Sequence, residues 1–155
     1  MTARLHRPFA PFAPPAPPAP PAPPAPPGSR GIDEILAAAR IRLHRLTPVE
    51  AHALQRNGGV LVDIRPHAQR RAEGGIPGTL VVERNHLEWR FDPRSDARLP
   101  IADRYDLPVV VLCSEGYTSS LAAATLQEIG LWRATDLAGG FKAWQAEGLP
   151  VESVA

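Results

Sequence analysis

The sequence predicts an α/β domain built around a mostly parallel β-sheet, and three observations lead to that prediction. First, short runs of β-branched and aliphatic residues, clearest at 60–64 and 109–112, are typical of strands that are buried on both faces. Second, these runs alternate with stretches of helical composition, which is the order found in parallel α/β sheets. Third, glycine and proline separate the runs, so that each element is short. We expect five strands flanked by helices, with the strands at residues 41–46, 60–64, 80–82, 109–112 and 134–137.

The beginning of the chain has a different composition from the rest. Residues 8–27 hold 12 of the 19 prolines, mostly as repeats of Ala-Pro-Pro. Because proline fixes φ and lacks the N–H that helices and sheets need, this segment favours polyproline II or disorder. We interpret residues 1–30 as a disordered Pro/Ala-rich tail and residues 31–155 as the folded domain. The tail fits a spacer, and a ligand for an aromatic groove is the alternative.

The first half of the domain begins with a predicted helix near Asp33, followed by the alternating segment 41–46. The run Thr-Pro-Val-Glu at residues 47–50 has the pattern of a capping box with proline at the first helical position. It predicts a helix that ends at the Asn-Gly-Gly of residues 57–59, just before the second strand.

In the second half, the glycine-rich run at 74–78 predicts a turn before the third strand, and residues 92–106 have the composition of a long surface excursion. The fourth strand is followed by an alanine-rich helix that ends at Gly130. Gly139-Gly140 then separates the last strand from the last helix. The two helices just named are predicted at residues 121–129 and 141–147. Two shorter helical segments are predicted at residues 66–72 and 85–89.

Cys113, the only cysteine of the chain, stands directly after the predicted strand 109–112. Ligands of open parallel sheets bind at the carboxyl ends of the strands, so Cys113 is in a position to meet one. The loop 114–118 contains Gly116 and leads to a helix that Ser119-Ser120 opens. A thiol on such a turn faces backbone N–H groups and the positive end of a helix, which favour the thiolate and bind anions. Cys113 is therefore the candidate nucleophile.

Length, charge and cysteine content limit the other possibilities. The 155 residues suit one domain, and a formal net charge of +1 gives no reason to expect nucleic acid or an anionic membrane as a partner. A single cysteine excludes an internal disulfide and fits a reducing compartment. No apolar run approaches the ~20 residues of a membrane span, so we expect a cytoplasmic protein. The five histidines lack metal-ligand spacing, and we expect neither a metal site nor a cofactor.

Five fragments between residues 42 and 151 resemble the rhodanese family of sulfurtransferases, and they occur in the family's order. They are Asp63-Ile64-Arg65, the Gly-Gly-Ile-Pro-Gly turn at 74–78, the loop Cys113-x-x-Gly116-x-Thr118-Ser119, Gly139-Gly140-Phe141-x-x-Trp144 and Gly148-Leu149-Pro150. The resemblance implies a rhodanese-like domain.

This resemblance also implies a sulfurtransferase that works through a persulfide on Cys113. The thiolate would take the outer sulfur of thiosulfate or of a low-molecular-weight persulfide and pass it to a thiol or another acceptor, with ping-pong kinetics. The implied partners are a small anionic sulfur donor and a thiol acceptor. A protein can take the place of the small thiol as the sulfur acceptor. The predicted substrate-binding residues form the remainder of the loop, Ser114, Glu115, Gly116, Tyr117, Thr118 and Ser119.

Other functions remain open. The loop carries Glu115 and no cation, and a carboxylate facing the sulfur would oppose both the thiolate and an anionic donor. The alternative is therefore a non-catalytic rhodanese-like module that binds a partner or senses oxidants through Cys113. A phosphatase is the third class, but the arginine that such a cysteine loop needs is replaced by Ser119. We interpret Arg65 as a brace for the loop, with a direct role in the site as the alternative.

Overall fold

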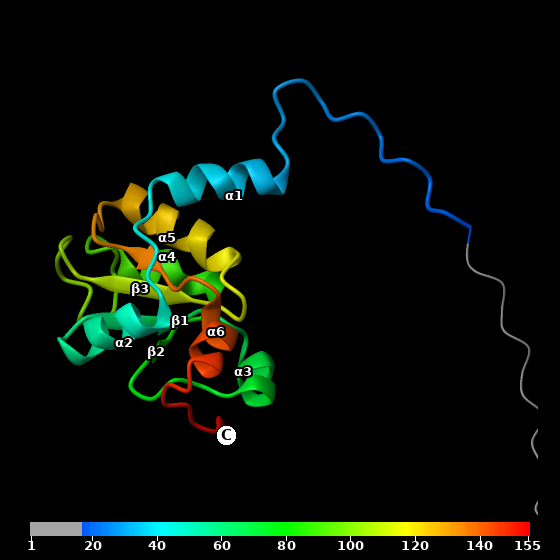
Figure 1. Cartoon of the computed structure of the whole chain (residues 1–155). Coiled ribbons are helices and arrows are strands. Elements are labelled where there is room, and N and C mark those ends of the chain that lie inside the picture. Colours follow the sequence, from blue (N-terminus) through cyan, green and yellow to red (C-terminus); the bar gives the residue numbers. More distant parts are fainter. Residues whose placement is uncertain (1–16) are drawn as a thin grey trace, which may run out of the picture.

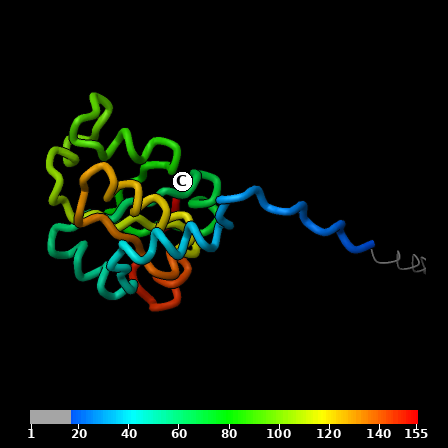
Figure 2. The backbone as a smooth tube through the Cα atoms, turned by 90° about the horizontal axis from the view of Figure 1, so that it is seen from above, coloured from blue at the N-terminus to red at the C-terminus, as the bar shows by residue number. Residues whose placement is uncertain are grey.

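The computed structural model describes residues 17–155. The first part of the predicted tail, residues 1–16, lies outside the described residues. Residues 17–30 are exposed and contain no helix or strand, and Figure 1 and Figure 2 show them running away from the rest of the molecule. The first helix begins at Ile32.

Four parallel strands form the sheet, in the spatial order β2-β1-β3-β4. The strands are β1 (Val60–Asp63), β2 (Leu80–Val81), β3 (Val109–Leu112) and β4 (Thr135–Asp136). β1 and β3 pair over their whole length, from Val60 opposite Val109 to Asp63 opposite Leu112. The carboxyl ends of the two central strands therefore lie side by side, and the chain leaves β3 there. The predicted α/β class and parallel sheet are confirmed.

The prediction of a strand at residues 41–46, which would have given the sheet five strands, is wrong. The first helix, α1 (Ile32–Ile41), continues into this segment and leaves its last residue 86% exposed. Leu46 alone joins the sheet edge, through one isolated parallel bridge to Leu137 beside β4. Since Thr47 already caps the next helix, the chain has room here for one sheet residue and not for a strand.

Helices cover both faces of the sheet (Figure 1). The helical elements are α1 (Ile32–Ile41), α2 (Pro48–Arg56), α3 (His67–Glu73), the 3-10 turn η1 (Arg84–His86), α4 (Leu87–Phe91), α5 (Thr118–Ile129) and α6 (Gly140–Ala146). α4 and α5 lie on one face, and α2 and α6 lie on the other. α1 packs on the outer side of α5 and so adds a further layer.

The predicted capping box starts α2 as expected. The Glu50 N–H donates to the Thr47 hydroxyl at 3.3 Å, and the Thr47 N–H donates to the Glu50 carboxylate at 2.8 Å. The backbone hydrogen bond and the side-chain hydrogen bond from Thr47 lower the pKa of Glu50. A short sequence pattern thus determines where the chain turns from the sheet edge into a helix.

Strand alternation divides the core in two. Val62 and Val111 belong to the cluster that packs under α4 and α5, whereas Leu61 and Val110 belong to the cluster under α2 and α6. Cys113 continues the alternation into the cluster on the α5 side. Within residues 17–155, none of the helices combines the length and the apolar character needed to cross a lipid bilayer.

Candidate active site

Cys113 is the first residue after β3 and opens the loop that leads into α5. Its side chain is nearly buried, at 6% exposure, and its Sγ accepts a hydrogen bond from the Gly116 N–H at 3.2 Å. A donor aimed at the sulfur favours the ionised form over the neutral one. The backbone of the loop therefore supplies a hydrogen-bond donor to the sulfur.

The first turn of α6 holds the loop backbone from one side. The Phe141 N–H donates to the Cys113 carbonyl at 2.8 Å, and the Lys142 N–H donates to the Ser114 carbonyl at 3.0 Å. N–H groups in a first helical turn lack partners within their own helix, so they are available for this contact. Gly140 permits the close approach, because a Cβ there would lie 2.5 Å from the Cys113 carbonyl oxygen.

Two arginines hold Gly116 from the other side. The Gly116 carbonyl accepts hydrogen bonds from Arg40 Nη2 at 2.8 Å and from Arg45 Nη2 at 2.9 Å. Gly116 has a φ of +85°, and a Cβ there would lie 2.8 Å from the Gly139 nitrogen, so this position requires glycine. The carbonyl is directed to the arginines while the N–H of the same residue faces the sulfur.

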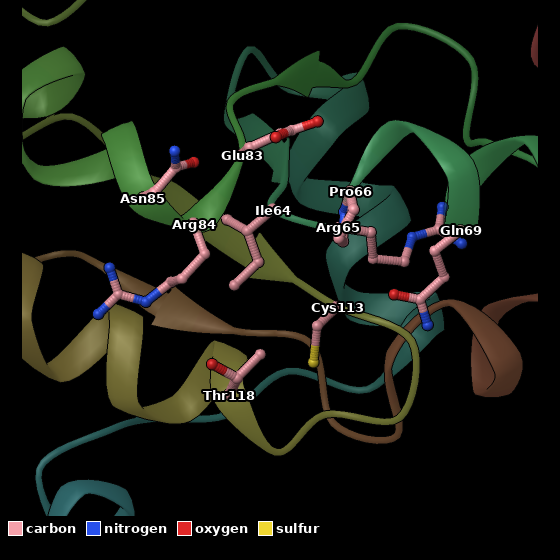
Figure 3. Close-up of a pocket in the computed structure, with 9 residues that line it drawn as sticks. All are labelled: Ile64, Arg65, Pro66, Gln69, Glu83, Arg84, Asn85, Cys113 and Thr118. Atoms are coloured by element: carbon pink, nitrogen blue, oxygen red, sulfur yellow. The ribbon is translucent and has the colours of Figure 1, made fainter.

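A pocket of about 400 Å³ opens beside Cys113 (Figure 3), a volume within the range of ~300–1,000 Å³ that is usual for small-molecule sites. Figure 3 shows the Cys113 sulfur near Thr118. Ile64 lies between this pair of residues and the segment that connects β2 with η1. The residues around the pocket are Ile64, Arg65, Pro66, Gln69, Glu83, Arg84, Asn85, Cys113 and Thr118. A second hollow of about 400 Å³, flanked by Tyr117 and Lys142, also reaches Cys113.

Arg84 brings a cation to the first pocket from outside the cysteine loop. Its Nη1 donates to both carboxylate oxygens of Glu88, at 2.7 and 2.9 Å. Its Nε and Nη2 donate to no other residue within 17–155. In the view of Figure 3 the guanidinium points away from Cys113 and lies on the far side of Thr118. This wall can therefore offer N–H donors to an anion.

Glu73, the last residue of α3, ties the loop to a buried ion pair. The Ser114 hydroxyl donates to both Glu73 oxygens, at 3.0 and 2.8 Å, and Arg65 Nη1 donates to the same carboxylate at 2.9 Å. Arg65 is 1% exposed and pairs with Asp63 at 2.6 Å. Burial alone would lower the pKa of Arg65, but its bonds to Asp63 and Glu73 outweigh burial and raise it. Arg65 reaches the loop only through Glu73 and also lines the first pocket, so the brace and the direct role in the site both stay predictions.

The structure separates the predicted loop residues into those at the pocket and those turned away from it. Thr118 lines both hollows beside Cys113. Tyr117 is 60% exposed and flanks the second hollow. Ser119 is fully buried, and its hydroxyl donates to Asp136 Oδ2 at 2.8 Å. The Ser119 side chain is therefore committed to the core and does not line either hollow.

Glu115 lines the second hollow and is directed to a cation. Its carboxylate is 54% exposed and pairs with the Lys142 ammonium of α6. The hydrogen bond and the charge of Glu115 raise the pKa of Lys142. The negative charge that would oppose a thiolate is thus paired with a cation and partly solvated.

Sequence reasoning missed the long-range partners of the loop, which are Arg40, Arg45, Glu73 and Lys142, and it missed Arg84 of the pocket wall. Each lies outside the loop, and no local spacing connects it with Cys113. Asp136 was also missed, although it lies in the predicted strand 134–137 and ends β4, at the same edge of the sheet as Cys113, which is where polar site residues are expected. Among residues 17–155, no group of histidine, cysteine, aspartate and glutamate side chains could hold a metal ion.

Comparison with known proteins gives one family. The family model of the rhodanese-like domain matches residues 47–147. The thiosulfate sulfurtransferase GlpE of Stutzerimonas stutzeri is 36% identical to this chain over 102 residues, which cover 65% of this chain and 84% of that protein. GlpE of Ectopseudomonas mendocina is likewise 36% identical over 102 residues, covering 66% of this chain and 84% of its own.

Solved structures show the same fold. A Rhodopseudomonas palustris protein of unknown function, named a possible tyrosine phosphatase, is 38% identical, with a TM-score of 0.73 and coverage of 80% of this chain and 96% of its own. A thiosulfate sulfurtransferase from Pseudomonas aeruginosa is 22% identical, with a TM-score of 0.64 and coverage of 79% of this chain and 22% of its own. The second similarity concerns the fold alone.

Proposed function

The chain belongs to the rhodanese-like family of sulfurtransferases, and from that premise we propose that it moves a sulfane sulfur from thiosulfate or a low-molecular-weight persulfide to a thiol through a persulfide on Cys113. The observation that carries this proposal is the hydrogen bond from the Gly116 N–H to the Cys113 sulfur at 3.2 Å. It favours a thiolate at the wall of a pocket of small-molecule size. We place the reaction in the cytoplasm, where thiol acceptors are reduced.

In the first half-reaction, the Cys113 thiolate attacks the outer sulfur of thiosulfate. A new S–S bond forms to Cys113, the S–S bond of thiosulfate breaks, and its electron pair leaves with sulfite. The enzyme then carries a persulfide anion, so that the three negative charges of the reactants are conserved. The Gly116 N–H supports the charge on the loop, and Thr118 is at hand to donate its hydroxyl.

In the second half-reaction, an acceptor thiolate attacks the terminal sulfur of the persulfide. The bond between the two sulfurs of the persulfide breaks, and the electron pair returns to Cys113 as a thiolate. No oxidant and no further cofactor is needed in either step. A protein thiol that reaches the open pocket serves as the acceptor in the same way as a small thiol.

An anionic donor requires a complementary charge, and two cations are at hand although the loop itself has none. Arg84 lines the pocket and has N–H groups without a partner among the described residues. Lys142 flanks the second hollow and forms an ion pair with Glu115. We assign donor binding to Arg84, because its free N–H groups can bind an oxyanion without breaking its ion pair with Glu88.

The test is steady-state release of sulfite from thiosulfate in the presence of a thiol. Turnover that follows ping-pong kinetics supports the proposal. A correctly folded protein that releases no sulfite from thiosulfate and takes no sulfur from an organic persulfide would instead be a non-catalytic module that binds a partner or senses oxidants.

Phosphate-ester hydrolysis is the second function to measure, because a structure named a possible tyrosine phosphatase is 38% identical. Ser119 stands where a cysteine phosphatase carries its arginine, and its hydroxyl is buried on Asp136. Arg40 and Arg45 donate to the outward-facing Gly116 carbonyl rather than into the loop. We expect no hydrolysis of an aryl phosphate under conditions in which sulfite is released.

A further inference from the structure

We infer, on the basis of the proposed function, that α1 and the segment after it form part of the catalytic apparatus, in which Arg40 and Arg45 are positioning residues for the cysteine loop. Both lie before residue 47, where the match to the rhodanese-like domain begins. They hold the loop from behind, through the carbonyl of Gly116.

The contact of Arg40 reaches across the fold to the loop. Arg40 is in the last turn of α1, and its Nη2 donates to the Gly116 carbonyl at 2.8 Å. Its Nε donates to the Ser120 hydroxyl at 3.1 Å, and its guanidinium lies 5.7 Å from the ring centroid of Tyr117. One side chain therefore touches the loop at its glycine, its aromatic residue and the first turn of α5.

The contact of Arg45 fixes the same carbonyl to the sheet. Its Nη2 donates to the Gly116 carbonyl at 2.9 Å, and its Nε and Nη2 donate to the two oxygens of Asp136 at 2.9 and 3.1 Å. Asp136 is fully buried in β4 and also accepts hydrogen bonds from Ser119 and Ser120, both at 2.8 Å. A planar guanidinium with several fixed donors is suited to joining these groups.

Together the two arginines determine the orientation of Gly116. A glycine with a positive φ has many alternative conformations in a free loop, so something must select the one whose N–H faces the sulfur. Two charged donors on its carbonyl make that selection, since charge-assisted hydrogen bonds are roughly twice as strong as neutral ones. Without them the Gly116 N–H is free to turn from Cys113, and the thiolate loses its donor.

The packing of α1 on α5 brings Arg40 to the loop. Leu36 and Ala39 are its buried residues, and the opposite side of the helix is exposed. Arg42, which follows α1, provides a matched comparison because it points to the surface and pairs with the exposed Glu128 at 2.9 Å. It carries the same charge two residues away from Arg40 and does not contact the loop.

The experiment measures the rate of Cys113 alkylation by iodoacetamide as a function of pH in the full-length protein, with Arg40→Met, Arg45→Met and Arg42→Met. Cys113 is the only cysteine, so intact mass reports it without ambiguity. We expect Arg40→Met and Arg45→Met to shift the profile to higher pH and to slow alkylation at pH 7 roughly fivefold, as the loss of one strong hydrogen bond implies. The rate at high pH, where the thiol is fully ionised, should not change.

Arg45→Met leaves Asp136 buried without its cation and can therefore unfold the protein. Arg40→Met removes no buried pair, and Arg45→Lys keeps a cation near Asp136, so these two variants carry the test if Arg45→Met fails to fold. An Arg40→Met profile that coincides with that of Arg42→Met overturns the inference. If the alkylation profile depends on Arg40 and Arg45 but the protein transfers no sulfur, the positioning role of the arginines is supported. The proposed sulfurtransferase function is then contradicted.

Discussion

Within residues 17–155, the Cys113 sulfur receives a hydrogen bond from the backbone of its own loop and none from a side chain. Three of the loop's carbonyls are bound from outside, those of Cys113 and Ser114 by α6 and that of Gly116 by the two arginines. These contacts hold the loop in the conformation in which the Gly116 N–H faces the sulfur. The proposed nucleophile is thus prepared by backbone geometry.

Arg84 is the residue through which we expect the donor's charge to be recognised. Arg84→Gln should raise the KM for thiosulfate about tenfold with a smaller effect on kcat, because a charge-assisted hydrogen bond to an oxyanion is lost and Cys113 is untouched. Initial rates over a range of thiosulfate concentrations give both constants. Arg94→Gln, at an exposed residue outside the pocket, is the control, and equal KM values for the two variants would show that Arg84 does not bind the donor.

Glu73 makes the stability of the site dependent on pH. Burial alone would raise the pKa of Glu73, but hydrogen bonds from Gln69, Ser114 and Arg65 outweigh it and lower the pKa. A lowered carboxylate pKa stabilises the fold above the unfolded value of roughly 4.3, and this contribution is lost as pH falls through the folded value.

We therefore expect Glu73→Gln to lower the free energy of unfolding at pH 7 and to weaken its dependence on acid. Urea denaturation at pH 7 and near pH 4 measures both effects. The exposed Glu147→Gln serves as the control. A Glu73 variant whose stability falls with acid as steeply as that of the parent protein would show that Glu73 does not carry this dependence.

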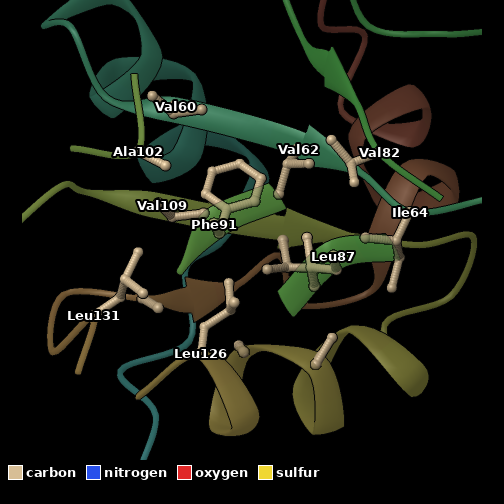
Figure 4. Packing of buried hydrophobic residues seen from close by; sticks show 14 of the residues in the cluster. Val60, Val62, Ile64, Val82, Leu87, Phe91, Ala102, Val109, Leu126 and Leu131 are labelled. Carbon is tan, nitrogen blue, oxygen red and sulfur yellow. The ribbon is translucent and has the colours of Figure 1, made fainter. Parts of the chain in front are cut away.

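At the scale of the elements, α5 connects the site with the core. Figure 4 shows Leu126 of α5 packed near Leu131, on the same side of the sheet as Phe91 and Leu87 of α4. Leu126 and Leu87 are fully buried. The position of the helix that follows the cysteine loop is therefore set by apolar packing far from the sulfur.

Leu126→Ala should lower the free energy of unfolding by about 2–5 kcal/mol, because it removes a fully buried side chain and leaves a cavity. Chemical denaturation provides the measurement. Ile41→Ala, at a residue that is 86% exposed, should change stability by less than about 0.5 kcal/mol. A similar loss in both variants would contradict this description of the core.

The sequence alone predicted the helices and strands whose signals lie within the element itself. The buried runs at 60–64 and 109–112 became β1 and β3, and the capping box at 47–50 started α2. The segment 41–46 had an alternating pattern too, but a strand also needs a pairing partner along its length, and the neighbouring helices left room for Leu46 alone. Local pattern predicts burial, whereas pairing depends on the whole chain.

The residues of the candidate site also divide into those that local sequence patterns predict and those that they do not. The strand-to-helix position of Cys113 and the glycine at 116 could be read from adjacent residues. The contact between Arg40 and Gly116 spans 76 positions, and that between Ser114 and Glu73 spans 41. No pattern within one element encodes which surface side chains meet across the fold. The loop therefore seemed to lack a cation, although two arginines lie behind it.

At the scale of the whole molecule, we propose that residues 1–30 are a tail that the domain does not need, and that the functional unit begins with α1. Deleting residues 2–28 should leave the Tm within about 3 °C and the alkylation profile of Cys113 unchanged. Deleting residues 2–42 removes α1 and Arg40, and should lower the Tm by more than about 5 °C and shift the profile to higher pH. Equal behaviour of the two truncated proteins would contradict the proposed boundary.

The persulfide on Cys113 is the central claim, and intact mass after exposure to thiosulfate tests it most directly. We expect the protein to gain the mass of one sulfur atom, to lose it when thiol is added, and to show no gain in the Cys113→Ser variant with an unchanged circular dichroism spectrum. Serine is nearly isosteric with cysteine, but its hydroxyl is not ionised near neutral pH, so the fold is kept and the nucleophile is lost. A parent protein that releases sulfite without gaining sulfur, or a Cys113→Ser variant that still releases it, would contradict the assignment.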